Sequence, residues 1–452
     1  MLRAARRFKP SWTIEFVLML AMLAGFAHLI YEYRTHGFLP LPFVYDVTDT
    51  FMDWFNPAYY AYNGHAYDIY ISIYAPLSFA ILKILGIASC YESHPKDARF
   101  CDYVGIASIM AFYALSVICA AIAFFRADRS TALFRSIGFG IGLPLLYALE
   151  RGNLIMIGFV FFIIFFGGLS KTRTGLATCA AMMINMKSYL LFPVLALALR
   201  REWRLLELCG IATIGLYLLS LAYYGSGTPI ELMNNLKVWF NAMASVVWDQ
   251  ISYSTTYRPF LQFDIHQYPV RDFVSQRIVD AVTIFINAEL LVSRLAALLC
   301  LALAWLYPKQ VPLHRMAFFL LMQSFVSDNP GGYGQSLIVF LVFLEKWSNP
   351  RVGIAIVMAY LISIPTDILF AKALEIERTS WLAGRIVETV YGLTLGSLLR
   401  PFLILVMLWA LVIDTMIDVH RAMKRERPQW AMRLRPYPSL SAPAAPAAPA
   451  AP

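Results

Sequence analysis

Two aspartates, Asp49 and Asp53, stand four residues apart in a segment that is rich in aromatic residues. On a helix this spacing puts both carboxylates on one face, where like charges repel each other. An arrangement that lowers helix stability indicates a function, and a carboxylate beside a substrate hydroxyl can act as a general base. The alternative is a solvated helix at a membrane interface, with Phe51, Trp54 and Phe55 on its other faces.

Three further polar features interrupt long apolar runs. The first is a polar break between two runs, with Glu150, Arg151 and Asn153. The second is Lys187, which lies about midway through a third run, and the third is the Pro/Gly-rich segment 327–335. Ionisable groups in apolar runs are costly and usually face a cavity or a partner, and cations there can hold an anionic phosphate. Each feature also has a plainer explanation: a tight loop for the break, an amine that reaches an interface for Lys187, and a Pro/Gly turn for residues 327–335.

The motifs that bind common cofactors do not occur in the sequence. It has no Walker A loop, no dinucleotide fingerprint, no closely spaced pair of metal-binding histidines and no nucleophile elbow. We therefore expect no cofactor. We also expect no metal, because two carboxylates alone make a poor site for a hard cation. Nucleic acid is not an expected partner, since the basic residues form no patch interleaved with aromatics.

The elements that carry these residues are predicted to be membrane helices. Of the 452 residues, 60% are hydrophobic and 14% are charged, and the mean hydropathy is +0.62. Soluble domains have about a quarter of their residues charged, and lipid offers an irregular backbone no hydrogen-bond partner. The sequence predicts an all-α polytopic membrane protein with roughly eleven to thirteen hydrophobic helices and interfacial helices in its external loops. The apolar segments fall near residues 12–31, 72–88, 103–125, 132–149, 152–169, 174–199, 205–224, 286–306, 313–327, 333–347, 352–371 and 395–418.

Two regions of different character follow from this pattern. Residues 1–419 are expected to form one multi-span transmembrane domain. Residues 420–452 are basic and end in Ala/Pro repeats, which cannot bury a core, so we expect a disordered cytoplasmic tail.

Lysine and arginine residues indicate the orientation in the membrane. The basic residues near both ends of the chain place both termini inside, so residues 32–71 and 225–285 would lie outside. Three arginines between residues 126 and 135 should also be inside, yet simple counting of spans puts them outside. A re-entrant segment at 72–88 would remove this conflict. It would also put Cys90 and Cys101 outside, where an oxidising compartment would let them pair.

Taken in order, these features resemble a known family. An acidic-aromatic loop follows the first span, and then come a Tyr-Ala-Pro-Leu entry to the next span, an Arg-Gly-Asn turn, a lysine with a later proline, and a basic cluster. The chain is similar to the polyprenyl-phosphate-sugar-dependent membrane glycosyltransferases of the C-type (GT-C) fold, most of all to the bacterial polyprenol-phosphate-mannose-dependent mannosyltransferases. The resemblance covers about residues 10–240. Its motifs stand at Tyr74–Leu77, Arg151–Asn153, Lys187, Pro193 and Arg200–Arg204.

The resemblance implies roles for individual residues. A carboxylate in the first external loop would take the proton of an acceptor hydroxyl, and the anomeric configuration would invert in a single displacement. Asp53 fits the family's loop motif better than Asp49, and both remain candidates for the base. The candidates for binding the donor phosphate and its sugar are Lys187, Arg151, Arg258, Tyr74, Asn153 and Glu150.

The expected function is transfer of a hexose or pentose from a polyprenyl-phosphate donor to a glycolipid or polysaccharide acceptor. Mannose is the best-known sugar of the similar family. The reaction would take place on the periplasmic side of a bacterial cytoplasmic membrane, among membrane lipids. Two alternatives remain open: a flippase or transporter of lipid-linked saccharides, which predicts internal repeats, and a polymerase or ligase of envelope polysaccharides.

Overall fold

The computed structural model describes residues 10–43, 47–242, 254–257, 275–325 and 332–425. Over these residues the chain is mostly helical, as its composition predicts. Six of the described helical segments are long and apolar enough to cross a membrane, and four shorter apolar helices accompany them. The protein is therefore a helical, polytopic membrane protein. The expected total of eleven to thirteen includes runs that the structure divides into shorter helices.

The first part of the described chain, up to residue 166, contains two long apolar helices and several short helices between and after them. The helices at 132–140 and 143–151 are separate because of Pro144. Proline lacks a backbone N–H donor and is best tolerated in the first turn of a helix. The helices are α1 (Pro10–His36), α2 (Met52–Asn63), α3 (Pro76–Ile84), η1 (Ala88–Tyr91), α4 (Pro95–Cys101), α5 (Tyr103–Ala127), α6 (Ala132–Gly140), α7 (Leu143–Arg151) and α8 (Ile155–Phe166).

The remainder of the described chain contains further apolar helices and, before the last of them, two strands. The elements are α9 (Arg173–Met186), η2 (Ser188–Leu190), α10 (Leu191–Val194), α11 (Ala196–Arg200), α12 (Trp203–Tyr224), α13 (Pro229–Ala242), α17 (Gln276–Leu306), α18 (Leu313–Phe325), η4 (Gly332–Gly334), α19 (Gln335–Phe343), α20 (Pro350–Ile362), β1 (Leu369–Ser380), β2 (Arg385–Thr394) and α21 (Leu395–Met423).

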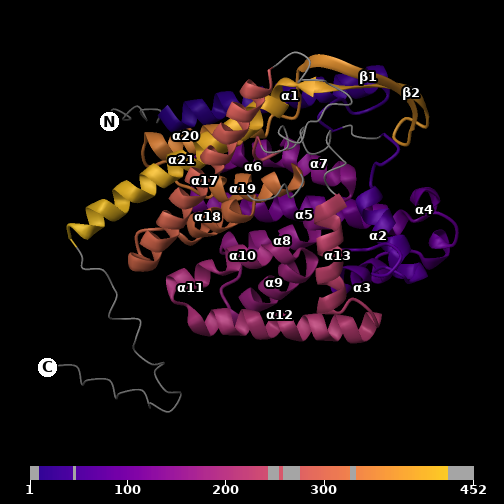
Figure 1. The fold of residues 1–452 in the computed structure, drawn as a ribbon, viewed down its shortest axis with the longest axis horizontal. Helices are drawn as coiled ribbons and strands as arrows, with labels where there is room; N and C mark the ends of the chain where they lie inside the picture. Colours follow the sequence, from indigo (N-terminus) through magenta and orange to yellow (C-terminus); the bar gives the residue numbers. More distant parts are fainter. Residues whose placement is uncertain (1–9, 44–46, 243–253, 258–274, 326–331, 426–452) are drawn as a thin grey trace, which may run out of the picture.

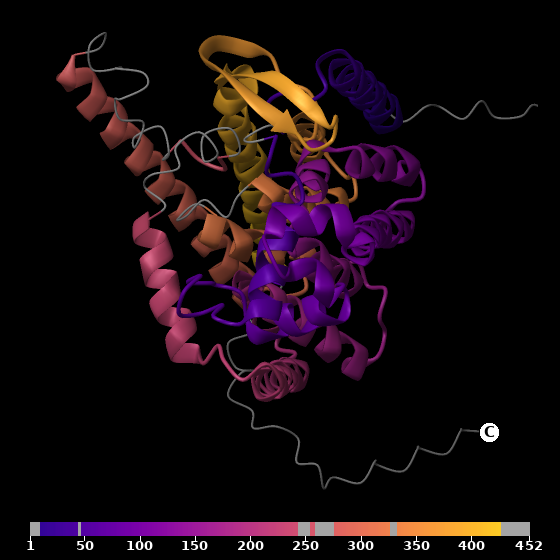
Figure 2. The same ribbon diagram turned by 90° about the vertical axis from the view of Figure 1, so that its right-hand side faces the viewer.

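Most of the long helices run side by side, so that the molecule has two distinct ends (Figure 1). One end, which we call the site end, carries α2, α3, α4 and the β1–β2 hairpin. The opposite end, which we call the terminal end, carries the start of α1 and the end of α21. Helix α13 runs across this direction and crosses that of α12, as both views show (Figures 1 and 2).

The segment 72–88 is too short to cross a membrane. Its helix α3 has nine residues, and at 1.5 Å per residue it is ~13 Å long, against a hydrocarbon core of ~30 Å. Helices α1 and α5 are therefore successive crossings, and α6, which follows α5, packs against α1. Arg135, shortly after α5, donates hydrogen bonds to both carboxylate oxygens of Glu15 in α1. This removes the conflict over the arginines at 126–135.

Buried ion pairs fasten the helices together at the terminal end. The side chain of Arg135 is 1% exposed and that of Glu15 is 0% exposed, and their two hydrogen bonds measure 2.7 and 2.8 Å. Arg315 of α18 binds both carboxylate oxygens of Glu345, each at 2.7 Å, and reaches Asp414 of α21 at 3.0 Å. A buried charge is tolerated only when it is paired and hydrogen-bonded. These pairs fix the positions of α1, α6, α18 and α21.

Aromatic packing fills the centre of the bundle. Phe124 of α5, Phe139 of α6, Phe159 and Phe162 of α8, and Phe340 of α19 are buried, and their ring centroids lie 5.7–6.3 Å apart in successive pairs. Edge-on and tilted ring pairs of this kind add to the free energy of burial. The core therefore supports α7 and α8, which meet at the candidate site.

The β-hairpin is a feature that the prediction of an all-α chain missed. The expected span 352–371 ends as a helix at Ile362, and β1 pairs with β2 in antiparallel register. Residues 385–390, Arg-Ile-Val-Glu-Thr-Val, are rich in β-branched side chains, which favour strands. Gly384 closes the turn with a φ of 64°, a conformation that suits glycine. The tip packs on the site end, where the ring of Trp381 lies 5.3 Å from that of Phe51.

Two further predictions can be compared with the structure. Cys90 and Cys101, left open by the sequence, form a disulfide that joins η1 to α4. The last helix, α21, continues four residues beyond the predicted domain boundary at 419, to Met423. The Ala/Pro-rich part of the tail lies outside the described residues.

Candidate functional site

One arginine brings the two predicted aspartates together at the site end. The guanidinium of Arg151 lies 2.5 Å from Asp49 through Nη1 and 3.2 Å from Asp53 through Nη2. Asn153 donates a 2.6 Å hydrogen bond from Nδ2 to the second carboxylate oxygen of Asp53. The carboxylates remain 26% and 23% exposed. Both are therefore held in place and reachable from solvent.

The positions of Arg151 and Asn153 follow from a sharp turn between two helices. Helix α7 ends at Arg151, and Gly152 takes a left-handed conformation with a φ of 63°. A Cβ atom on Gly152 would lie 3.0 Å from the Cα of Phe51, so only glycine permits this approach. The side-chain oxygen of Asn153 accepts a hydrogen bond from the backbone N–H of Ile155 at the start of α8. The same side chain thus begins α8 and orients Asp53.

The structure corrects the predicted arrangement of the acidic segment. Asp49 does not share a helical face with Asp53, because α2 begins only at Met52 and Phe51 has a φ of 64°. The two carboxylates converge because the chain turns through this left-handed residue. The alternative of a solvated interfacial helix does not describe α2, because Trp54 is 1% exposed and Phe55 0% exposed, and both belong to the protein core.

The left-handed turn at Phe51 is held by several contacts. A bulky residue with positive φ is strained and persists only where its surroundings enforce it. The backbone N–H of Phe51 donates to the carbonyl of Glu150 at 2.8 Å, and the hydroxyl of Thr50 donates to the Glu150 carboxylate at 2.9 Å. Arg99 donates to the carbonyl of Thr50 at 2.8 Å and lies over the ring of Trp381. The hairpin tip and α4 therefore help to position the aspartates.

Lys187 lies where the structure interrupts the long apolar run at 174–199. Helix α9 ends at Met186, and Lys187 has an extended backbone. Its ammonium lies 4.2 Å from the ring centroid of Tyr74 and 5.4 Å from that of Tyr333. Among the described residues no carboxylate lies within ion-pair distance of it, although the charge of Asp53 is close enough to act on it. The ammonium is thus available to an anionic ligand beside Asp53.

Tyrosines complete the wall of the site. Burial raises the pKa of the Tyr74 hydroxyl well above its usual value, so this group stays protonated. Tyr333 was not predicted as a site residue; it lies in η4, within the Pro/Gly-rich sequence segment 327–335, and its ring stacks on that of Tyr147 in α7. A turn rich in Pro and Gly is the feature of the sequence that could have indicated it. Rings at these positions can pack against the apolar face of a sugar.

Two predicted residues differ from this group. Arg258 lies outside the described residues. Glu150 is buried; one of its carboxylate oxygens accepts from Thr50, and the other has no hydrogen-bond partner among the described residues. Glu150 thus binds Thr50 and, among the described residues, makes no hydrogen bond or ion pair with Arg151.

Within the described parts of the chain, no group of three or more His, Cys, Asp or Glu side chains could hold a metal ion. The guanidinium of Arg151 already occupies the position between the Asp49 and Asp53 carboxylates. The guanidinium of Arg151 therefore compensates the negative charges of the two carboxylates.

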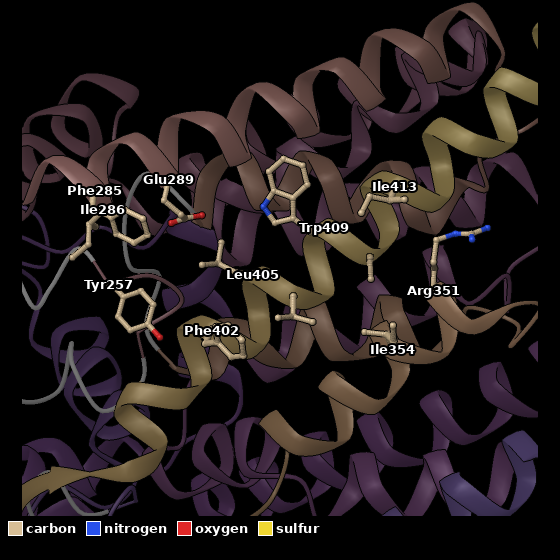
Figure 3. Close-up of a pocket in the computed structure, with 12 residues that line it drawn as sticks. Tyr257, Phe285, Ile286, Glu289, Arg351, Ile354, Phe402, Leu405, Trp409 and Ile413 are labelled. Carbon is tan, nitrogen blue, oxygen red and sulfur yellow. The ribbon is translucent and has the colours of Figure 1, made fainter. Parts of the chain in front are cut away.

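A groove of about 500 Å³ lies elsewhere, between α17, α20 and α21 (Figure 3). Its walls are almost entirely apolar, with Trp409 and Glu289 pointing into the space between α17 and α21, and Arg351 at one end. Glu289 accepts a hydrogen bond from Ser293 at 2.7 Å. None of the predicted site residues that the structure describes lines this groove.

No protein-family model, curated protein or solved structure matches this chain. The function must therefore be argued from the geometry at the site end. That geometry offers an oriented carboxylate, a nearby unpaired ammonium and several aromatic rings. Together these groups can accept a proton, neutralise a phosphate and contact a sugar.

Proposed function

We propose that this protein is a membrane glycosyltransferase that uses a polyprenyl-phosphate sugar as donor and a glycolipid or polysaccharide as acceptor. The observation that carries the proposal is the position of Asp53. Arg151 and Asn153 orient its two oxygens, and its charge acts on the ammonium of Lys187, which has no carboxylate within ion-pair distance among the described residues. A base beside a phosphate-binding cation is what transfer from a lipid phosphate requires.

In the proposed reaction the acceptor hydroxyl oxygen attacks the anomeric carbon of the donor. The new C–O bond forms as the bond between that carbon and the phosphate oxygen breaks. The hydroxyl proton moves to the Asp53 carboxylate, and the electron pair of the broken bond leaves with the polyprenyl phosphate. Lys187 stabilises the negative charge that develops on this leaving group. The single displacement inverts the anomeric configuration.

Of the two aspartates, Asp53 is the better candidate for the base. Its charge acts on both Lys187 and Tyr74, so it lies on the side of the cluster where the donor phosphate would bind. Asp49 approaches Arg151 at 2.5 Å and lies outside α2. We assign Asp49 the role of holding Arg151 in place.

We place the site end on the outer side of the membrane. Loops at the terminal end are rich in lysine and arginine, which are retained inside. The disulfide between Cys90 and Cys101 lies at the site end, and disulfides persist in oxidising compartments. Both observations support a periplasmic site in a bacterial cytoplasmic membrane. The basic residues of the terminal loops include Arg126, Arg129, Lys171, Arg173, Arg200, Arg201, Arg204 and Lys309.

The test is sugar transfer by the purified protein in liposomes. Polyprenyl-phosphate donors carrying labelled mannose, glucose, galactose or arabinose are supplied with a membrane extract as the source of acceptors. We expect one donor to be used, and Asp53→Asn to lower its rate by about 10²–10⁴-fold, the range for loss of a general base. Asp68→Asn is the matched control, because Asp68 is in the same segment, is exposed, and contacts His65 instead of Arg151.

Three outcomes would change the assignment. Full activity of Asp53→Asn with an inactive Asp49→Asn variant would move the base to Asp49. Activity in both variants would refute a base in this segment. Transfer from none of the donors by folded protein would favour a flippase, or a polymerase or ligase.

A further inference from the structure

A second pocket, of about 330 Å³, lies between α1, α5 and α7 beneath the tip of the hairpin. Its walls are apolar, with Ile30 from α1, Met110 from α5, Leu146 from α7 and Leu382 from the hairpin. Ile30 is 40% exposed and Met110 is 44% exposed, so the pocket opens on the surface that these two spanning helices present to lipid. An aliphatic chain can therefore enter it directly from the bilayer.

The polar feature of this pocket is Glu150. Thr50 and Glu150 both line it, and one oxygen of the Glu150 carboxyl group is buried without a hydrogen-bond partner in the part of the chain that the structure describes. A buried polar atom without a hydrogen bond is destabilising, and a ligand that supplies the missing partner gains that free energy on binding. A hydroxyl suits these two lining side chains chemically, because it can donate to a carboxylate or accept from a carboxylic acid.

The absence of a lysine or arginine from the residues that line this pocket decides which lipid is excluded. An anionic phosphate in this pocket would meet a carboxylate and no cation, whereas Lys187 supplies a cation on the side of Asp53. The two places are nevertheless joined, because Thr50 and Phe51 line the pocket and lie between Asp49 and Asp53 in the chain. The pocket is thus adjacent to the site but unsuited to the phosphate-bearing donor.

We propose that this pocket binds the acceptor, and that the acceptor is a lipid with a hydroxyl-bearing, uncharged head. Its aliphatic chain lies between α1 and α5, and a hydroxyl of its head is held by Glu150 at the wall shared with the acidic segment. That the bound lipid is the acceptor rests on the proposed glycosyl transfer. The binding of a neutral hydroxyl lipid stands on the pocket alone and can be measured without any donor.

The test is photolabelling in proteoliposomes. A diacylglycerol with a diazirine in one acyl chain is compared with the phosphatidic acid of the same chains, and labelled peptides are located by mass spectrometry. We expect diacylglycerol to label α1 and α5 near Ile30 and Met110 at least tenfold more than phosphatidic acid does. Leu146→Trp, which fills the pocket, should remove the labelling. Ile118→Trp, at an exposed position of α5 that does not line the pocket, should leave it unchanged.

Variants of Glu150 test the head group separately. Glu150→Leu should abolish the preference for diacylglycerol, because one hydrogen bond to a buried carboxyl group corresponds to about tenfold or more in affinity. Glu150→Gln keeps a donor and an acceptor and should retain most of the preference, which also shows that the fold survives. Equal labelling by both lipids, or labelling that Leu146→Trp does not affect, would overturn the proposal.

The outcome is independent of the transfer assay. If sugar transfer is observed but diacylglycerol does not label the pocket, the proposed function stands and the acceptor pocket is refuted. If the labelling is as expected but Leu146→Trp leaves the rate of transfer unchanged, the occupant is not the acceptor. Loss of both labelling and transfer in the folded Leu146→Trp protein supports the inference.

Discussion

The substitution Arg135→Met tests the buried ion pair between Arg135 and Glu15. This pair holds one end of the helical segment Ala132–Arg151, whose other end carries Arg151. Arg135 and Glu15 are 1% and 0% exposed and share two hydrogen bonds, and Arg135 also donates to the carbonyls of Phe343 and Glu345 at 2.7 Å. Arg135→Met leaves the Glu15 carboxylate buried without its cation. Breaking a buried pair in this way costs about 3–5 kcal/mol, and we expect a loss of that size in the free energy of unfolding.

The second partner provides the internal control. Removing both charges, in Arg135→Met with Glu15→Gln, eliminates the uncompensated carboxylate, so most of the lost stability should return. Arg126→Met is the matched surface control, because Arg126 is exposed and donates to one carbonyl, that of Gly168. It should change the free energy of unfolding by no more than about 0.5 kcal/mol.

The assay is reversible denaturation in mixed micelles, followed by the tryptophan fluorescence of the protein. Sugar transfer per folded molecule should stay unchanged in Arg135→Met, since the pair lies at the terminal end and the aspartates at the site end. A loss below about 1 kcal/mol would refute the reasoning. So would a double variant that is as unstable as Arg135→Met, because the carboxylate would then not be the cause.

Two further results are expected. Lys187→Met should lower kcat/KM for the lipid-phosphate donor by about 10²–10³-fold while diacylglycerol labelling is retained, because the ammonium acts on the leaving phosphate alone; a loss below tenfold would exclude this role. Thiol alkylation of intact cells should leave Cys90 and Cys101 unmodified until a reductant is added, and Cys90→Ser should cost about 2–3 kcal/mol of stability through the lost cross-link. Free thiols at both positions would contradict the proposed orientation.

The sequence alone determined the class of the protein and the course of its main helices. The apolar runs at 12–31, 103–125, 205–224 and 395–418 became α1, α5, α12 and α21 with ends close to those predicted. This works because a span needs about twenty apolar residues in a row, which is a local property of the chain. The sequence also singled out Lys187, since a charge within an apolar run is costly, and the structure shows that α9 ends just before it.

The candidate site was predictable in its members but not in its geometry. Asp53 and Arg151 are 98 residues apart in the chain, and only the packing of α2 against α7 brings them into contact. A helical spacing rule placed Asp49 on α2, yet the left-handed backbone of Phe51 carries it off the helix. That conformation depends on contacts from α7, α4 and the hairpin, none of which is local to Phe51.

The hairpin and the pocket beside Glu150 were decided by tertiary structure alone. A run of β-branched residues at 385–390 is compatible with a helix or a strand, and pairing with β1 selects the strand. Likewise, the sequence around Glu150 indicates no more than a tight loop. Only the packing of α1, α5 and the hairpin tip around this residue forms the pocket. Apolar length and the cost of an isolated charge are properties of a segment, and the sequence fixes them. Which charges are paired, and which remain buried without a partner, depends on neighbours that only the folded chain supplies.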